Sequence, residues 1–118
     1  MKFRVLLSAM LLAAGVVFVA GCDSPKKGFN EWKSAIVKGD VTKANERTTK
    51  DGQTMNAMIV AGFQDDAKSK AAFEKLEIVS CDKKDDDHAT LKVKDAEGKT
   101  SDIQMVREDG KWKVDIKK

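Results

Sequence analysis

The sequence lacks an excess of charge of either sign. Its 118 residues include 22 basic and 19 acidic side chains, and no segment gathers the basic ones into a stripe. Proteins that bind nucleic acids neutralise phosphates with clustered lysine and arginine, so we expect no nucleic-acid partner. The chain also lacks internal repeats and low-complexity linkers, and its length suits one domain.

Residues suited to catalysis are equally scarce. There is no tyrosine, and His88 is the only histidine. No serine or cysteine has a base at the spacing of a nucleophilic motif. We therefore expect no catalytic residues, no cofactor and no enzymatic activity.

Two groups of residues could in principle hold a metal ion. His88 follows the acidic run 85–87, whose carboxylates are ligands for hard cations. However, consecutive residues of a turn point in different directions, and there is no glycine-punctuated calcium loop. Met55 and Met58 offer soft sulfur that suits copper, but methionines at helical spacing usually belong to a core. We predict no metal site, a solvated acidic connector and two core methionines.

The first 22 residues have the pattern of a lipoprotein signal peptide. Lys2 and Arg4 give a positive start, and an apolar stretch follows that is short for a stable membrane span. It ends in Val-Ala-Gly-Cys at residues 19–22, a lipobox, in which the thiol accepts a diacylglyceryl group and the small residues admit the peptidase. We predict a signal peptide over residues 1–21 and a lipid-modified Cys22; the alternative is an uncleaved apolar helix.

The predicted anchor sets the location of the protein. Each buried methylene of an acyl chain contributes about 0.8 kcal/mol, so two or three chains attach a lipoprotein permanently to a membrane of the cell envelope. Asp23 resembles the signal that retains lipoproteins on the periplasmic face of the inner membrane in cells with two membranes. We expect residues 22–27 to form a lipidated tether and residues 28–118 to form the domain.

Cys81 is then an odd thiol in a compartment that often favours disulfides. It could pair between chains or be reactive. We favour a small, buried hydrophobic residue on a strand. Because the only other cysteine carries the lipid, we predict no intramolecular disulfide.

Helical periodicity dominates the first half of the mature chain. Ser24 and Pro25 suit the N-cap and first position of a helix that ends at Gly39. Asp40 is placed to cap a short second helix. Apolar residues mark the inner face of the first helix at Phe29, Trp32 and Ile36, and that of a third helix at Met55, Met58, Ile59, Gly62 and Phe63. A weaker helical segment surrounds Phe73.

From Leu76 the apolar period changes to two, as in strands with one buried face. The expected inward residues are Leu76, Ile78 and Ser80, then Ala89, Leu91 and Val93, then Ile103 and Met105, and finally Trp112, Val114 and Ile116. Asp109-Gly110 is a strong signal for a two-residue hairpin turn. We predict an α+β fold, with N-terminal helices packed on a curved four-stranded antiparallel sheet.

The chain resembles a group of small bacterial lipoproteins that are classed as a domain of unknown function in the nuclear transport factor 2-like, or cystatin-like, superfamily. The matching pieces are the Pro25 helix with Phe29 and Trp32, Gly39-Asp40 followed by Lys43-Ala44, the strand Ala89-x-Leu91-x-Val93, and the closing segment from Glu108 to Val114. The resemblance implies a sheet wrapped round a long helix as a cone that often holds a pocket. It implies no activity, since enzymes, binders and scaffolds share this fold.

Three classes of function stay open. We favour a membrane-anchored, non-catalytic envelope lipoprotein that binds a protein partner or a small apolar ligand as an accessory module. The alternatives are a structural or oligomer-forming lipoprotein and, less favoured, a small pocket enzyme. Two or more inward titratable side chains would favour an enzyme, and an exposed apolar patch would favour a binder over a scaffold.

Overall fold

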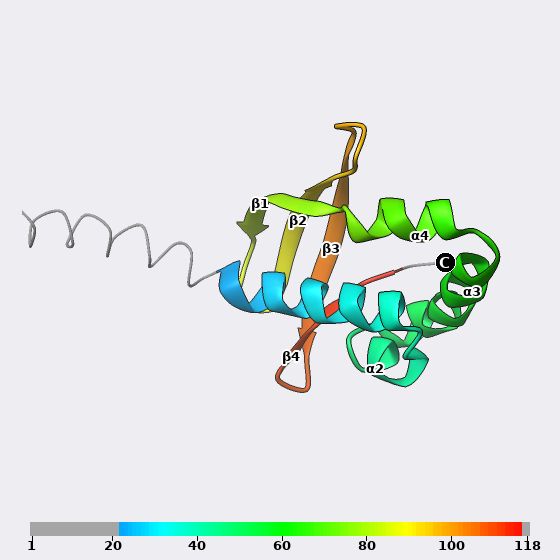
Figure 1. The fold of residues 1–118 in the computed structure, drawn as a ribbon. Coiled ribbons are helices and arrows are strands. Elements are labelled where there is room, and N and C mark those ends of the chain that lie inside the picture. The colour runs from blue at the N-terminus through cyan, green and yellow to red at the C-terminus, as the bar shows by residue number, and fades with distance from the viewer. Residues whose placement is uncertain (1–21, 117–118) are drawn as a thin grey trace, which may run out of the picture.

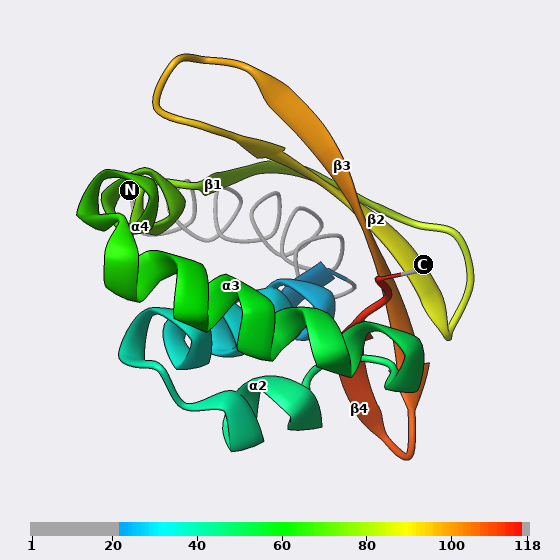
Figure 2. The same cartoon turned by 90° about the vertical axis from the view of Figure 1, so that its right-hand side faces the viewer.

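The computed structural model describes residues 22–116, in which helices pack on one face of a four-stranded antiparallel sheet (Figure 1). This confirms the expected α+β class and the order of helices before strands. The elements are a first helix over residues 22–38, α2 (Val41–Glu46), the 3-10 helix η1 (Lys50–Gly52), α3 (Gln53–Asp65), α4 (Ala67–Glu74), β1 (Glu77–Lys83), β2 (His88–Lys94), β3 (Thr100–Glu108) and β4 (Lys111–Val114). Strands that follow one another in sequence are neighbours in the sheet, which bends over the first helix (Figure 2).

The first helix corrects one prediction about the start of the domain. The chain is already helical at Cys22, so Ser24 is not the N-cap, and residues 22–27 lie within the described part of this helix. Pro25 is buried in this helix. Proline has no N–H and clashes with the carbonyl four residues earlier, so a helix accepts it best in the first turn. In the described part of the helix, Pro25 is the fourth residue from Cys22.

The core lies between the first helix and the inner face of the sheet. Phe29, Trp32 and Ile36 are buried on the helix, as their spacing predicts. The sheet contributes a matching row of buried residues, namely Ala89, Leu91, Val93, Met105, Trp112 and Val114. The two layers approach each other closely at Gly28, where an added Cβ would lie 2.5 Å from the carbonyl oxygen of Trp112. Only glycine lets the helix approach β4 this closely.

A bulge in β1 breaks the predicted alternation of that strand. Ile78 pairs with Val93, but Ser80 pairs with Lys92, so one extra residue is inserted between Ile78 and Ser80. A bulge of this kind shifts the phase of the side chains that follow. Ile78 and Cys81 are partly buried against the core, whereas Val79 and Ser80 are exposed. Strict alternation would place Ser80, not Cys81, on the side of Ile78, and the bulge gives that place to Cys81, which was predicted to be buried and is partly buried.

The two methionines of α3 are not core residues. Met55 is 42% and Met58 is 65% exposed, and α3 instead buries Asn56 and Val60, with Ile59 and Phe63 partly buried. The prediction from helical spacing was wrong for the methionines because Asn56, a polar residue, occupies the centre of the buried face.

Asn56 holds three helices together through a buried polar network. It accepts a hydrogen bond from Nε1 of Trp32 on the first helix at 2.9 Å. Its amide nitrogen donates to Oδ1 of Asn45 at 2.9 Å and to Oγ1 of Thr48 at 3.0 Å. The Thr48 hydroxyl in turn donates to the carbonyl of Ala44 at 2.7 Å. Because every group is satisfied, the network can be buried without an unpaired donor or acceptor.

The turn between β3 and β4 has the predicted geometry. Asp109 and Gly110 have φ values of 54° and 76°, the left-handed conformations that a type I′ turn requires. The turn sets the register in which Arg107 pairs with Trp112, and Trp112 faces the core as predicted.

Gly110→Val is expected to lower the free energy of unfolding by about 1–2 kcal/mol, because a β-branched residue is strained at positive φ. An added Cβ would meet nothing within 4 Å, so the loss would report backbone strain alone. Denaturant melts measure it, with Gly62→Ala as the control, since Gly62 is helical and also has open space around it. That control is expected to be neutral or stabilising, and a Gly110→Val protein as stable as wild type would contradict the turn assignment.

Candidate functional site

Cys22 and Cys81 form a disulfide that joins the first helix to β1. Their Cα atoms lie 6.1 Å apart, although 59 positions separate them in the sequence. Both residues are partly exposed. The prediction that Cys81 makes no intramolecular disulfide was therefore wrong. Its reasoning assumed that the Cys22 sulfur was already occupied, and it could not foresee that the fold brings the two residues together.

The β1 bulge explains how Cys81 reaches Cys22. With strict alternation from Ile78, Ser80 would face the first helix and Cys81 would face away from it. The extra residue turns Cys81 toward the helix instead. The bulge thus determines which side chain of β1 lies against the start of the first helix.

Asp23 lies beside this disulfide in the first described turn of the helix and is exposed. It was singled out as a membrane-sorting residue. In this position its carboxylate is accessible to another molecule at the same end of the domain as Cys22. No helix within residues 22–116 is long and apolar enough to cross a membrane.

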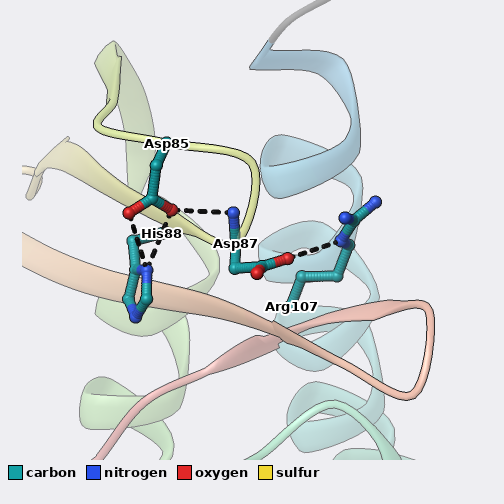
Figure 3. Close-up of polar contacts among 4 residues, drawn as sticks. All are labelled: Asp85, Asp87, His88 and Arg107. Carbon is teal, nitrogen blue, oxygen red and sulfur yellow. Dashed lines mark hydrogen bonds and ion pairs between the residues drawn. The ribbon is translucent and has the colours of Figure 1, made fainter.

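The acidic connector and His88 form an exposed polar cluster between the end of β1 and the start of β2 (Figure 3). Nδ1 of His88 lies 2.9 Å from Oδ1 and 3.1 Å from Oδ2 of Asp85. The hydrogen bond to His88 and a second bond from the backbone N–H of Asp87 hold the pKa of Asp85 below its usual value. The Asp87 carboxylate accepts a hydrogen bond from Nε of Arg107 at 3.0 Å.

The contacts in this cluster hold the connector between β1 and β2 in place and leave its side chains exposed, unlike those of a protected reactive centre. The side chains of Asp85 and His88 are each 60% exposed. The Asp87 side chain points away from His88 toward Arg107 (Figure 3). The backbone N–H of Arg107 also donates to the carbonyl of Asp87 at 2.8 Å. Within residues 22–116 no three histidine, cysteine or acidic side chains are grouped so that they could hold a metal ion.

A surface cleft of about 300 Å³ lies between the first helix and α2. Its lining is mostly charged, with Glu31, Lys38, Lys43 and Arg47 among its residues. Arg47 is ion-paired to Glu31 and also donates to the carbonyl of Trp112 at 3.3 Å. The cleft therefore has the character of a water-exposed surface between packed helices, unlike the apolar pocket that a small apolar ligand requires.

The outward face of α3 is a surface that sequence reasoning missed. Residues 53–64 carry no charged side chain in a chain that is 35% charged. Met55, Ala57, Met58, Ala61 and Gly62 are exposed along this face. Figure 1 shows α3 at the end of the first helix remote from Cys22. The uncharged run is visible in the sequence, but helical spacing assigned Met55, Met58 and Gly62 to the core.

Comparisons of this chain with protein-family models, with curated proteins and with solved structures gave no match.

Proposed function

We propose that the chain is an exported bacterial lipoprotein, anchored to an envelope membrane through Cys22, whose domain is a non-catalytic binding or accessory module. The lipobox at residues 19–22 is the observation that carries this proposal. In the anchored chain the Cys22 sulfur holds the lipid and Cys81 is a free thiol. We assign the protein to the periplasmic face of the inner membrane in cells with two membranes, because Asp23 follows the lipidated cysteine.

Two features of the structure are compatible with export and with cleavage before Cys22, although the disulfide itself occupies the sulfur that the lipid would need. The disulfide between Cys22 and Cys81 is consistent with an oxidising compartment outside the cytoplasm. Pro25 is the fourth residue of a chain that begins at Cys22, and the first four N–H groups of a helix have no partner within it. Because proline has no N–H, Pro25 donates no helical hydrogen bond whether or not the chain is cut before Cys22.

The buried polar groups support a role without catalysis. Within residues 22–116 the buried polar side chains are Thr48, Thr49 and Asn56, which have no titratable group. All three are hydrogen-bonded to other parts of the fold. Catalytic acids and bases need a titratable group held in a protected site.

The uncharged face of α3 supports binding to a protein. Exposed methionines adapt to varied partner surfaces, and small residues such as Ala57 and Ala61 let another backbone approach closely. The same face could also join copies of this chain, which is the structural or oligomer-forming alternative. We further propose that the domain is a small member of the cystatin-like, nuclear transport factor 2-like cone, because its sheet bends over one long helix (Figure 2).

Intact-mass analysis of the membrane fraction is expected to find a chain that starts at Cys22 and carries acyl mass. Cys22→Ser should remove the acyl mass and leave precursor or released protein, because oxygen cannot replace the sulfur nucleophile. Ser24→Ala keeps the lipobox and serves as the control. A soluble mature chain in which Cys22 is unmodified would contradict the anchor. Crosslinking in membranes then separates the two roles: a different captured protein supports the module, and only copies of this chain support the oligomer.

A further inference from the structure

We propose that Cys81 competes with the lipid donor for the Cys22 thiol, so that oxidising conditions determine how much of the protein becomes anchored. This inference rests on the lipidation of Cys22 proposed above. Its starting point is the disulfide, which uses the same sulfur atom that the lipobox marks for modification. One sulfur cannot be a thioether and half of a disulfide at once.

The two reactions of Cys22 are chemically distinct. In lipidation, the thiol loses its proton and the sulfur forms a bond to a glycerol carbon of a phospholipid. The phosphate headgroup leaves with the electron pair of the broken carbon–oxygen bond. In disulfide formation, Cys22 and Cys81 together lose two protons and two electrons. An envelope thiol oxidase takes them up as its own disulfide is reduced to two thiols.

The folded domain makes Cys81 an effective competitor. The Cα separation of 6.1 Å lies within the range that a disulfide spans without backbone movement. Cys81 reaches this position because the β1 bulge turns it inward and because the first helix is already regular at Cys22. Both residues are partly exposed, so an oxidase can reach them.

Folding decides when this competition begins. In the unfolded chain, 59 positions separate the two cysteines, and closing so long a loop is entropically unfavourable. Lipid transfer that precedes folding therefore meets a free Cys22 thiol. Once β1 and the first helix have packed together, the disulfide can form, and its sulfur can no longer attack the lipid donor.

The test expresses the full chain in bacterial cells that are fed a traceable fatty acid, which reports acylation. A heavy maleimide then shifts the protein on gels once for each free thiol. Wild type is expected to give two pools. One is acylated with a free Cys81 thiol, and the other is unacylated with neither thiol free until a reductant is added. Cys81→Ser should lose the second pool. Ser80→Ala, a neighbouring exposed change that keeps both sulfurs, should match wild type.

A second arm keeps the wild-type sequence, so it does not depend on how the variant folds. In cells that lack the envelope thiol oxidase, wild type should become fully acylated. Equal acylated fractions in wild type and Cys81→Ser, with Cys81 free in every wild-type copy, would overturn the competition and leave the anchor standing. Absence of acylation in all variants and both strains would overturn the proposed function itself, and the competition with it.

Discussion

Trp112→Ala is expected to lower the free energy of unfolding by about 3–5 kcal/mol, as truncation of a buried aromatic side chain usually does. Trp112 is only 6% exposed and lies on β4 against the first helix. Its backbone carbonyl also accepts a hydrogen bond from the Arg47 guanidinium at 3.3 Å. The contact with Gly28 is so close that the helix cannot shift far to fill the space left by the indole. The free-energy cost of the unfilled cavity should therefore add in full to the cost of no longer burying the indole.

Denaturant melts of the domain without its lipid would measure this loss. Lys111→Ala is the matched control, because Lys111 is the preceding residue of the same strand and is exposed. Its effect should stay within about 0.5 kcal/mol. A Trp112→Ala protein as stable as the control would overturn the packing of β4 on the helix.

Asn56→Ala is expected to cost about 3 kcal/mol, since each buried polar group left without its partner costs about 1–3 kcal/mol. The indole N–H of Trp32 would lose its acceptor. Asn45 and Thr48 would each lose the amide donor that they share. The loss should appear as a lower denaturant midpoint and, in hydrogen exchange, as weaker protection of α2 and α3.

Met58→Ala provides the control on the same helix. Met58 is 65% exposed, and alanine is the best helix former, so stability should change by less than about 0.5 kcal/mol. If Met58→Ala destabilised the protein as much as Asn56→Ala, the orientation of α3 in the structure would be wrong. The pair therefore tests directly which face of α3 the fold buries.

Strands with strict alternation could be predicted from the sequence almost residue by residue. Ala89, Leu91 and Val93 are all buried, because a period of two leaves one choice of face once a core exists. The Asp109-Gly110 turn was equally clear, since few residue pairs accept two positive φ values. In the strand and in the turn, the local sequence was sufficient to predict the structure.

Prediction from the sequence was wrong where a contact between residues distant in the sequence determined the structure. In α3, apolar spacing favoured the methionines, but the indole N–H of Trp32 needed a buried acceptor and Asn56 supplied it. In β1, nothing local marked the bulge between Ile78 and Ser80. The helix around Phe73 was predicted from a weak pattern, and contacts of Phe73 with Trp32 and Phe63 anchor it in the structure.

The candidate site was predictable in part for the same reason. The residue types around Cys22 could be interpreted directly, because the lipobox is a contiguous motif. Its contact with Cys81 depends on the packing of the first helix against the sheet and could not be inferred from sequence neighbours. The polar and charged residues at 22–27 look like a linker in the sequence, whereas the structure makes them part of the first helix and buries Pro25 among them.

The helical conformation of the chain from Cys22 onward gives the proposed anchored protein a fixed reach. Seventeen helical residues from Cys22 onward make a rod about 25 Å long. A flexible linker would let the domain sample a wide volume, but this rod holds α3 within one helix length of the lipid. A partner that uses the uncharged face of α3 must therefore present its own surface within that height above the bilayer, as a neighbouring membrane protein does.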